Sequence, residues 1–265
     1  MTVLEIDDIG RLRILRLNRP ERKNALTGEL IQALTSAIRV AATDEDVWAI
    51  AITGNGDAFC SGLDLDQSSG DERSNESNSS DDAHREGDGV HNLSVLMRVE
   101  CDKPIVAGVN GVAVGLGVSL AMNADIRIAA PTARFHPGYA RVATSPDGGL
   151  TWTLTRALGY ERALRFLLEQ RMVSASEAFA LGLVSEVAEG DFEARLLEYG
   201  TMLANVAPLA ARQTKRMLVR ADQPPDLAAH LGEEITLALR GLASDDSAEA
   251  VRAMVAKEPP RFTGC

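Results

Sequence analysis

The sequence is poor in aromatic and cysteine residues and has no surplus of positive charge. Aromatic side chains make up 4% of its 265 residues, which argues against surfaces that stack nucleic-acid bases. The three cysteines are odd in number, widely spaced and without a CxxC pair, so neither a disulfide framework nor a zinc site is expected. The formal net charge of −11 argues against binding to nucleic acid or to anionic lipid.

Long apolar runs are missing as well. No stretch is long enough to cross a bilayer, and the first residues, MTVLEIDDIGRLRILRLNRP, show no secretory signal. Together with the cysteine pattern, this predicts a reduced, cytoplasmic protein with no membrane partner. The hydrophobic residues, 45% of the chain, are enough for one large and mostly aliphatic core.

Strand and helix patterns alternate through the first half of the chain. LRILRLNRP and VWAIAIT predict strands, and LTGELIQALTSAIRVAATD predicts a helix with Thr27 as its N-cap. KPIVAGVNGVAVGLGVSLAMNADIRIAA predicts a strand, a glycine-rich turn, a helix and another strand. Such alternation needs crossover connections and therefore predicts an α/β fold with a largely parallel sheet.

Two other regions have a different character. Residues 66–88 contain no large apolar side chain, which predicts a mobile or disordered insertion, with a substrate-facing lid as the alternative. From about Thr151 the pattern is mainly helical, with a capping box at Ser174 and Glu177. We therefore expect a core over residues 1–195 and a helical region over 196–265, packed on the core or on another subunit.

Three glycines, Gly111, Gly115 and Gly117, stand between an apolar strand and an apolar helix in NGVAVGLGVSLAM. The first N–H groups of a helix have no partner within it, and they suit an anion or a developing oxyanion. Close packing of helix on sheet is the alternative role for these glycines. The spacing is neither G-x-G-x-x-G nor that of a phosphate loop, so neither a dinucleotide nor a nucleoside triphosphate is indicated.

Together with DAFCSGLDL at residues 57–65, this stretch resembles the crotonase superfamily, the enoyl-CoA hydratases and isomerases. LNRPERKNALT, PDGGLTWTLTRALG, SASEAFALGLVSEV and KEPPRFTGC match the same family in the family's order. The resemblance implies a ββα spiral core and a helical C-terminal trimerisation region, in a homotrimer or a dimer of trimers. It also implies an acyl-coenzyme A thioester of fatty acid metabolism as substrate, with no cofactor or metal besides the coenzyme A of that substrate.

The resemblance further implies which groups act on the thioester. The backbone N–H groups of Leu63 and Leu116 would form an oxyanion hole, although most members have glycine at the second position. Two amides aimed at the carbonyl oxygen stabilise the charge that arrives there without having to reorganise.

The positions implied to contact coenzyme A are Arg22, Lys23, Ala25, Ser61, Asp64, Leu65, Lys257 and Phe262. Because the protein is acidic and coenzyme A is anionic, local cations, with Arg19 and Arg261 as further candidates, have to compensate. For each cation, a solvated surface position is the alternative. Asp64 has the alternative role of fixing its own loop through backbone hydrogen bonds.

Hydratases of this family use two glutamates, and the matching positions here are Ser119 and Tyr139. Neither side chain accepts a proton readily at neutral pH. Asp147, in SPDGGLTW, resembles the aspartate of 1,2-epoxyphenylacetyl-CoA isomerases and related double-bond isomerases. A single carboxylate can take a proton from one carbon and return it to another, so isomerisation is the predicted reaction. Capping of the following helix is the alternative role for Asp147.

Other functions stay open at this point. The chain could be a hydratase, and hence a lyase, that lacks both usual glutamates. It could be an acyl-CoA hydrolase with Asp147 as nucleophile or water activator, or a binder without catalysis. His136 is a second candidate base, with a structural hydrogen bond as the alternative. Cys60 is interpreted as a small buried thiol.

Overall fold

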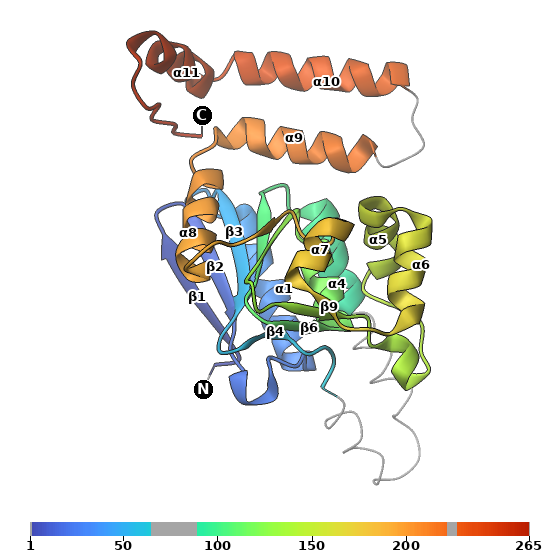
Figure 1. Cartoon of the computed structure of the whole chain (residues 1–265). Helices are drawn as coiled ribbons and strands as arrows, with labels where there is room; N and C mark the ends of the chain where they lie inside the picture. Colours follow the sequence, from blue (N-terminus) through green and yellow to red (C-terminus); the bar gives the residue numbers. More distant parts are fainter. Residues whose placement is uncertain (1, 65–88, 222–226, 265) are drawn as a thin grey trace, which may run out of the picture.

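The computed structural model describes residues 2–64, 89–221 and 227–264 (Figure 1). The insertion predicted over residues 66–88 lies outside these ranges. The helix predicted after Thr27 is α1, Gly28–Thr43, and the Thr27 side chain accepts a hydrogen bond from the Leu30 amide, as expected of an N-cap. Its apolar positions at helical spacing, Leu30, Ile31, Leu34 and Ile38, all face the core.

The larger sheet has six strands in the order β1-β2-β3-β5-β7-β10. Their bounds are Leu4–Ile9, Leu12–Leu17, Ala49–Gly54, Ile105–Val109, Ile126–Ala129 and Glu186–Val187. Only β1 runs antiparallel to its neighbour among these pairs, in a hairpin with β2. The predicted parallel sheet is therefore confirmed, and its central strands are buried on both faces, as their continuous apolar runs require.

A second sheet, of order β4-β6-β8-β9, was not predicted from the sequence. Its short strands are Ala58–Cys60, Val112–Val114, Arg134–His136 and Val173–Ser174. Successive chain units place one strand in each sheet: β3 then β4, β5 then β6, and β7 then β8. This winding is the ββα spiral that the resemblance implies.

Helices cover the two sheets and continue beyond them (Figure 1). Residues 89–95 are helical and lead into the π-helical turn η2, Leu96–Glu100. The 3₁₀ turns are η1, Pro20–Arg22, and η3, Tyr139–Val142. The remaining helices are α4 Leu116–Asn123, α5 Leu150–Leu158, α6 Tyr160–Glu169, α7 Ala175–Leu181, α8 Phe192–Leu203, α9 Pro208–Ala221, α10 Leu227–Leu242 and α11 Asp245–Ala256. The predicted capping box of Ser174 and Glu177 begins α7.

The last three helices form a layer beyond α8, away from the two sheets (Figure 1). Helix α9 is attached to the core by charged groups: the Lys215 ammonium bonds the Met97 and Lys103 carbonyls, and Arg212 and Arg216 pair with Asp102. The predicted division at residues 195 and 196 stays a prediction, and α8, which packs on the larger sheet, spans it. In the described parts of the chain, no helix has the length and apolarity that crossing a membrane requires.

Candidate active site

Two turns that are far apart in the sequence meet at the N-terminus of α4. Gly117, in the first turn of the helix, lies so close to β4 that a Cβ atom there would be 2.1 Å from the Cys60 carbonyl oxygen. Gly62, with φ of +96°, lies beside Val114, and a Cβ on it would be 3.7 Å from the Leu116 nitrogen. The glycines of both motifs are therefore required for close approach of the two backbones.

The backbone amides of Leu63 and Leu116 lie on these two turns. A β-bridge between Leu26 and Leu63 fixes the first turn, with hydrogen bonds from Leu26 N to Gly62 O and from Asp64 N to Leu26 O. The second amide is the first in α4, directly after Gly115 with φ of +53°. Within the described ranges, no protein acceptor is placed on either amide. Both donors thus remain available for a ligand, as an oxyanion hole requires.

Ser119, Tyr139 and Asp147 form one hydrogen-bonded group beside this helix. The Tyr139 hydroxyl donates to Asp147 Oδ1 at 2.6 Å, and the Ser119 Oγ lies 2.8 Å from the Tyr139 hydroxyl oxygen. The Ser119 Oγ also lies 3.1 Å from the backbone carbonyl oxygen of Asp147. Burial, followed by the hydrogen bond to Asp147, raises the pKa of the Tyr139 phenol well above its usual value. Tyr139 is therefore a protonated donor here and not a phenolate base.

The turn that carries Asp147 is held by side chains of neighbouring helices. The Gly148 carbonyl accepts hydrogen bonds from Asn123 of α4 and from Ser94 of the helix at 89–95. The N-cap of α5 is Gly149, with no side-chain hydrogen bond, so the alternative in which Asp147 caps this helix is wrong. Its exposed carboxylate is instead directed to Tyr139. The sequence analysis did not find this role for Tyr139, because no spacing rule links residues 119, 139 and 147.

A narrow apolar cavity of about 10 Å³ lies next to these groups. Leu116, Ser119 and Gly148 line one part of it, and Leu26, Ile31, Val90, Leu93, Ser94, Leu120 and Asn123 complete its wall. Its volume is about that of one water molecule, because the Leu116 side chain and its apolar neighbours fill the space. Leu116 and the helix at 89–95 supply apolar side chains to this lining, whereas Val118 lies in the core with no exposed surface.

The first group of predicted coenzyme A contacts lies around η1 and the turn before Leu63. The Ser61 amide and hydroxyl bond the carbonyls of Lys23 and Arg22. The Lys23 ammonium pairs with Asp57 at 2.5 Å, and Ala25 is buried. Asp64 is buried in an ion pair of 2.8 Å with Arg19, whose guanidinium also donates to the Ala25 carbonyl. Asp64 therefore fixes its loop chiefly through a side-chain ion pair, which sequence reasoning missed.

The second group is not brought to the first within this chain. Lys257 ends α11 in a left-handed conformation, and Phe262 lies in the segment that follows. Figure 1 shows this C-terminal segment on the layer of α9 to α11, apart from α4 and η1. Leu65 falls outside the described residues. A role for Lys257 and Phe262 would therefore require a neighbouring subunit.

Two further residues are explained by their surroundings. Cys60 has no exposed surface, and burial raises the pKa of its thiol to about 12, so it is the inert buried thiol that was predicted. His136 is buried in β8, with Nε2 2.9 Å from the Gln170 carbonyl oxygen. This is the structural hydrogen bond given above as the alternative to catalysis by His136.

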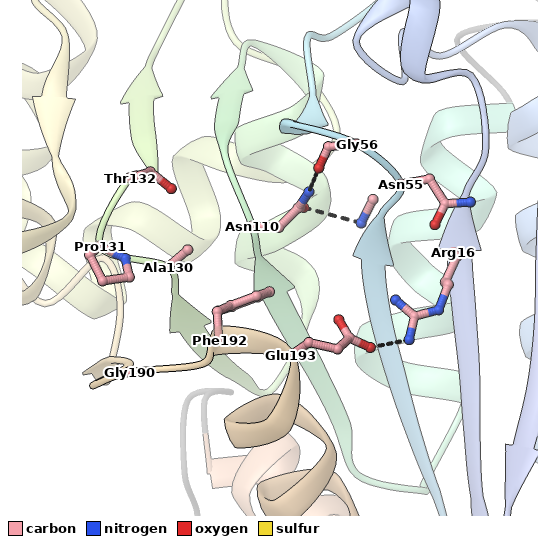
Figure 2. A pocket seen from close by; sticks show the side chains of 11 residues that line it. Arg16, Asn55, Gly56, Asn110, Ala130, Pro131, Thr132, Gly190, Phe192 and Glu193 are labelled. Carbon is pink, nitrogen blue, oxygen red and sulfur yellow. Dashed lines mark hydrogen bonds and ion pairs between the residues drawn. The ribbon is translucent and has the colours of Figure 1, made fainter.

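A larger hollow, of about 570 Å³, lies elsewhere, at the carboxyl ends of β3, β5 and β7 (Figure 2). None of the predicted site residues lines it. Figure 2 shows Arg16 directed toward Glu193 and Asn110 toward Gly56, and both contacts are polar pairs within the protein. Among the described residues, no cluster of histidine, cysteine or carboxylate side chains has the arrangement of a metal site. The groups beside α4 therefore remain the candidate active site.

Known proteins resemble this chain in sequence and in fold. A probable enoyl-CoA hydratase of Rhodobacter capsulatus is 35% identical, over 96% of this chain and 95% of the relative. The 1,2-epoxyphenylacetyl-CoA isomerase of Escherichia coli is 29% identical over 94% of both chains. The crystal structure of an enoyl-CoA hydratase from Polaromonas sp. JS666 superimposes with a TM-score of 0.90, at 31% identity, covering 98% of this chain and 99% of that one. The sequence profile of the enoyl-CoA hydratase/isomerase family matches residues 11–265, so the chain belongs to this family and has the crotonase fold.

Proposed function

We propose that this enzyme moves a carbon–carbon double bond in an acyl-CoA thioester, with Asp147 as the single base. The observation that carries the proposal is the hydrogen bond from Tyr139 to Asp147 Oδ1, beside the helix that presents the Leu116 amide. The carboxylate is held by a donor, is exposed to a ligand and does not cap α5. These are the properties that a general base needs before the substrate arrives.

In the proposed reaction the thioester carbonyl accepts hydrogen bonds from the Leu63 and Leu116 amides. Asp147 takes a proton from one carbon, and the electron pair of the broken C–H bond moves into an enolate whose oxygen the amides stabilise. Return of the proton to a second carbon shifts the double bond. Arg22, Lys23, Ala25, Ser61, Asp64 and Leu65 are proposed to surround the coenzyme A part of the substrate.

Hydration is the second candidate, because the R. capsulatus relative is named a hydratase. The two positions that the resemblance assigns to hydratase glutamates hold hydroxyl groups here, and those hydroxyls are bonded to Asp147 and to each other. Asp147 is left as the one carboxylate of this group, which suits proton return better than the paired handling of a water molecule. Hydrolysis and binding without turnover complete the alternatives.

Two parallel incubations distinguish isomerisation, hydration, hydrolysis and binding without turnover. The purified protein is mixed with a 3-enoyl-CoA, and separately with a 2-enoyl-CoA, and mass and ultraviolet absorbance are followed. Isomerisation leaves the mass unchanged and creates or removes the conjugated enoyl thioester. Hydration adds one water, hydrolysis frees coenzyme A, and a binder changes neither substrate. A product of increased mass, free coenzyme A or no change would each reject the isomerase.

Asp147→Asn tests the base directly. We expect the loss of at least about two orders of magnitude in turnover, because a general base contributes roughly that much. Affinity for coenzyme A should stay within a fewfold, since the amide keeps the shape of the carboxylate. Calorimetric titration with coenzyme A checks the second point. Turnover at the wild-type rate in this variant would place the base elsewhere.

We also propose a cytoplasmic homotrimer or dimer of trimers, in which a neighbouring subunit brings Lys257 and Phe262 to the ligand. The support is the exposed apolar surface of the helical layer, where Leu239, Met254 and Val255 are more than half exposed. Light scattering of the purified protein measures the subunit number.

A further inference from the structure

The hydroxyls of Ser119 and Tyr139 form a small hydrogen-bonded group with Asp147, and Ser119 Oγ also lies 3.5 Å from the Gly115 carbonyl oxygen. Each hydroxyl carries one proton and can also accept hydrogen bonds. Three contacts are present: Tyr139 to Asp147 Oδ1 at 2.6 Å, Ser119 to Tyr139 at 2.8 Å, and Ser119 to the Asp147 carbonyl at 3.1 Å. The three contacts close a ring that begins and ends on Asp147.

With the carboxylate ionised, the direction of this ring is fixed. A carboxylate only accepts, so Tyr139 donates to Oδ1, and Ser119 then gives its proton to the Tyr139 oxygen. Both hydroxyls are buried, with 1% and 7% of the Ser119 and Tyr139 residues exposed, so water is not the usual partner of either group. Donation to the charged form stabilises the ionised base.

With the carboxyl protonated on Oδ1, both hydroxyls turn the other way, and the contact from Ser119 to the Asp147 carbonyl, which carries no proton in the ionised state, gains one. The carboxyl proton then points to the Tyr139 oxygen, the Tyr139 proton to Ser119 Oγ, and the Ser119 proton to the Asp147 carbonyl oxygen. Every proton has an acceptor in both states, so neither state buries an unpaired hydroxyl, which would cost about 1–3 kcal/mol.

We propose that Tyr139 and Ser119 are positioning residues that reorient as a pair and keep Asp147 hydrogen-bonded in both of its protonation states. The inference rests on the proposed function. During the reaction one C–H bond breaks, its electron pair enters the enolate, and its proton joins the carboxylate. The proton and the electron pair form a new C–H bond at the second carbon, while the hydroxyl protons only turn and none is lost.

The elements next to the Ser119, Tyr139 and Asp147 group differ in the titratable side chains that they carry. Helix α4 carries no titratable side chain, η3 carries Arg141, α5 carries Arg156 and the helix at 89–95 carries His91. All three side chains lie on exposed residues, and Arg156 lies over the Trp152 ring. The Asp147 carboxylate accepts a hydrogen bond from the Tyr139 hydroxyl.

Tyr139→Phe and Ser119→Ala test the pair, with kcat and KM for a 3-enoyl-CoA measured separately. Loss of the Tyr139 hydroxyl leaves Asp147 Oδ1 without the group that holds it in both protonation states, so kcat should fall roughly tenfold. Ser119→Ala should lower kcat by less. The double variant should match Tyr139→Phe, because Ser119 acts through Tyr139. KM should change by less than about threefold.

Tyr160→Phe, which removes a hydroxyl from an exposed residue, is the matched control and should leave kcat unchanged. A kcat at the wild-type value in folded Tyr139→Phe and Ser119→Ala overturns the pairing. If Tyr139→Phe does not fold, Ser119→Ala decides by the same criterion. The proposed function fails separately, through an active Asp147→Asn.

Discussion

Helices α4 and α10 are both rich in apolar residues, yet they occupy opposite environments. All eight residues of α4 are buried, and its Gly117 has no room for a single additional carbon atom. In α10 the side chains of Leu231, Ile235 and Leu239 are more than half exposed, and Gly232 faces open space. The Leu116 amide of the candidate oxyanion hole therefore belongs to a helix that is packed on every side. The exposed face of α10 is instead a surface that the proposed assembly would cover.

The largest effect is expected at Gly117, where α4 packs closest against β4. In Gly117→Ala the new methyl group would lie 2.1 Å from the Cys60 carbonyl oxygen, so α4 or β4 has to move. We expect a loss of about 3 kcal/mol or more in the free energy of unfolding, beyond ordinary overpacking because the obstacle is backbone. Turnover should fall with it, since the same contact sets the distance between the two amides. Urea unfolding and the enoyl-CoA assay measure the two effects.

Gly232→Ala is the matched control, because it also replaces a helical glycine by alanine. No atom lies within 4 Å of the added carbon, so the higher helix propensity of alanine should stabilise the chain by up to about 1 kcal/mol. Equal stability losses in both variants would contradict the contrast between the two helices.

Most of the fold could be predicted from the sequence, because its signals are local. The cap at Thr27, the helical spacing after it and the apolar runs of β3 and β5 each fix one element. The second sheet was missed because its strands, such as Ala58–Cys60, are only two or three residues long. So short a run carries no readable periodicity.

The site could be predicted only where a motif carried it. The glycines at 62 and 117 marked the two turns through the family resemblance, and the structure brings those turns together. The hydrogen bond between Tyr139 and Asp147 joins two loops whose side-chain directions no local pattern determines. The Arg19 and Asp64 ion pair spans 45 residues and escaped notice for the same reason.

The next largest effect is expected where the helical layer joins the core. The Lys215 ammonium is buried and bonds Asp125 at 2.8 Å, besides two carbonyl oxygens. Lys215→Met removes these bonds and leaves the carboxylate without its cation, which should cost about 3 kcal/mol. Arg216→Ala is the control: its side chain is half exposed and Asp102 keeps Arg212, so the loss should stay below about 1 kcal/mol. Similar urea midpoints for both variants would show that the Lys215 ion pair does not stabilise the attachment of α9 to the core.

A smaller effect is expected from a charge placed on the outer face of α10. Leu239→Glu should weaken assembly by about 2 kcal/mol, the contribution of one leucine side chain buried between subunits. Light scattering over a dilution series measures the shift toward the monomer. Val40→Glu, with the same 58% exposure but on α1, should leave the mass unchanged. If both variants assemble like the wild type, the α10 face is not part of the interface.

The smallest effects are expected at the N-cap hydroxyls of two helices, α1 in the core and α11 in the helical layer. Thr27 is a buried residue that begins α1 and accepts a hydrogen bond from the Leu30 amide at 3.2 Å, whereas Ser244 begins α11 with an equal bond from the Ser247 amide. Thr27→Ala leaves a buried donor unpaired and should cost about 1.5 kcal/mol, while Ser244→Ala, where water can replace the hydroxyl, should cost about 0.5 kcal/mol. Thr27→Ser should restore most of the loss.

Because Leu26, beside the Thr27 cap, bridges to Leu63, only Thr27→Ala is expected to slow turnover as well. Equal urea midpoints for the two alanine variants, with unchanged turnover in both, would show that burial of the cap has no bearing on the site.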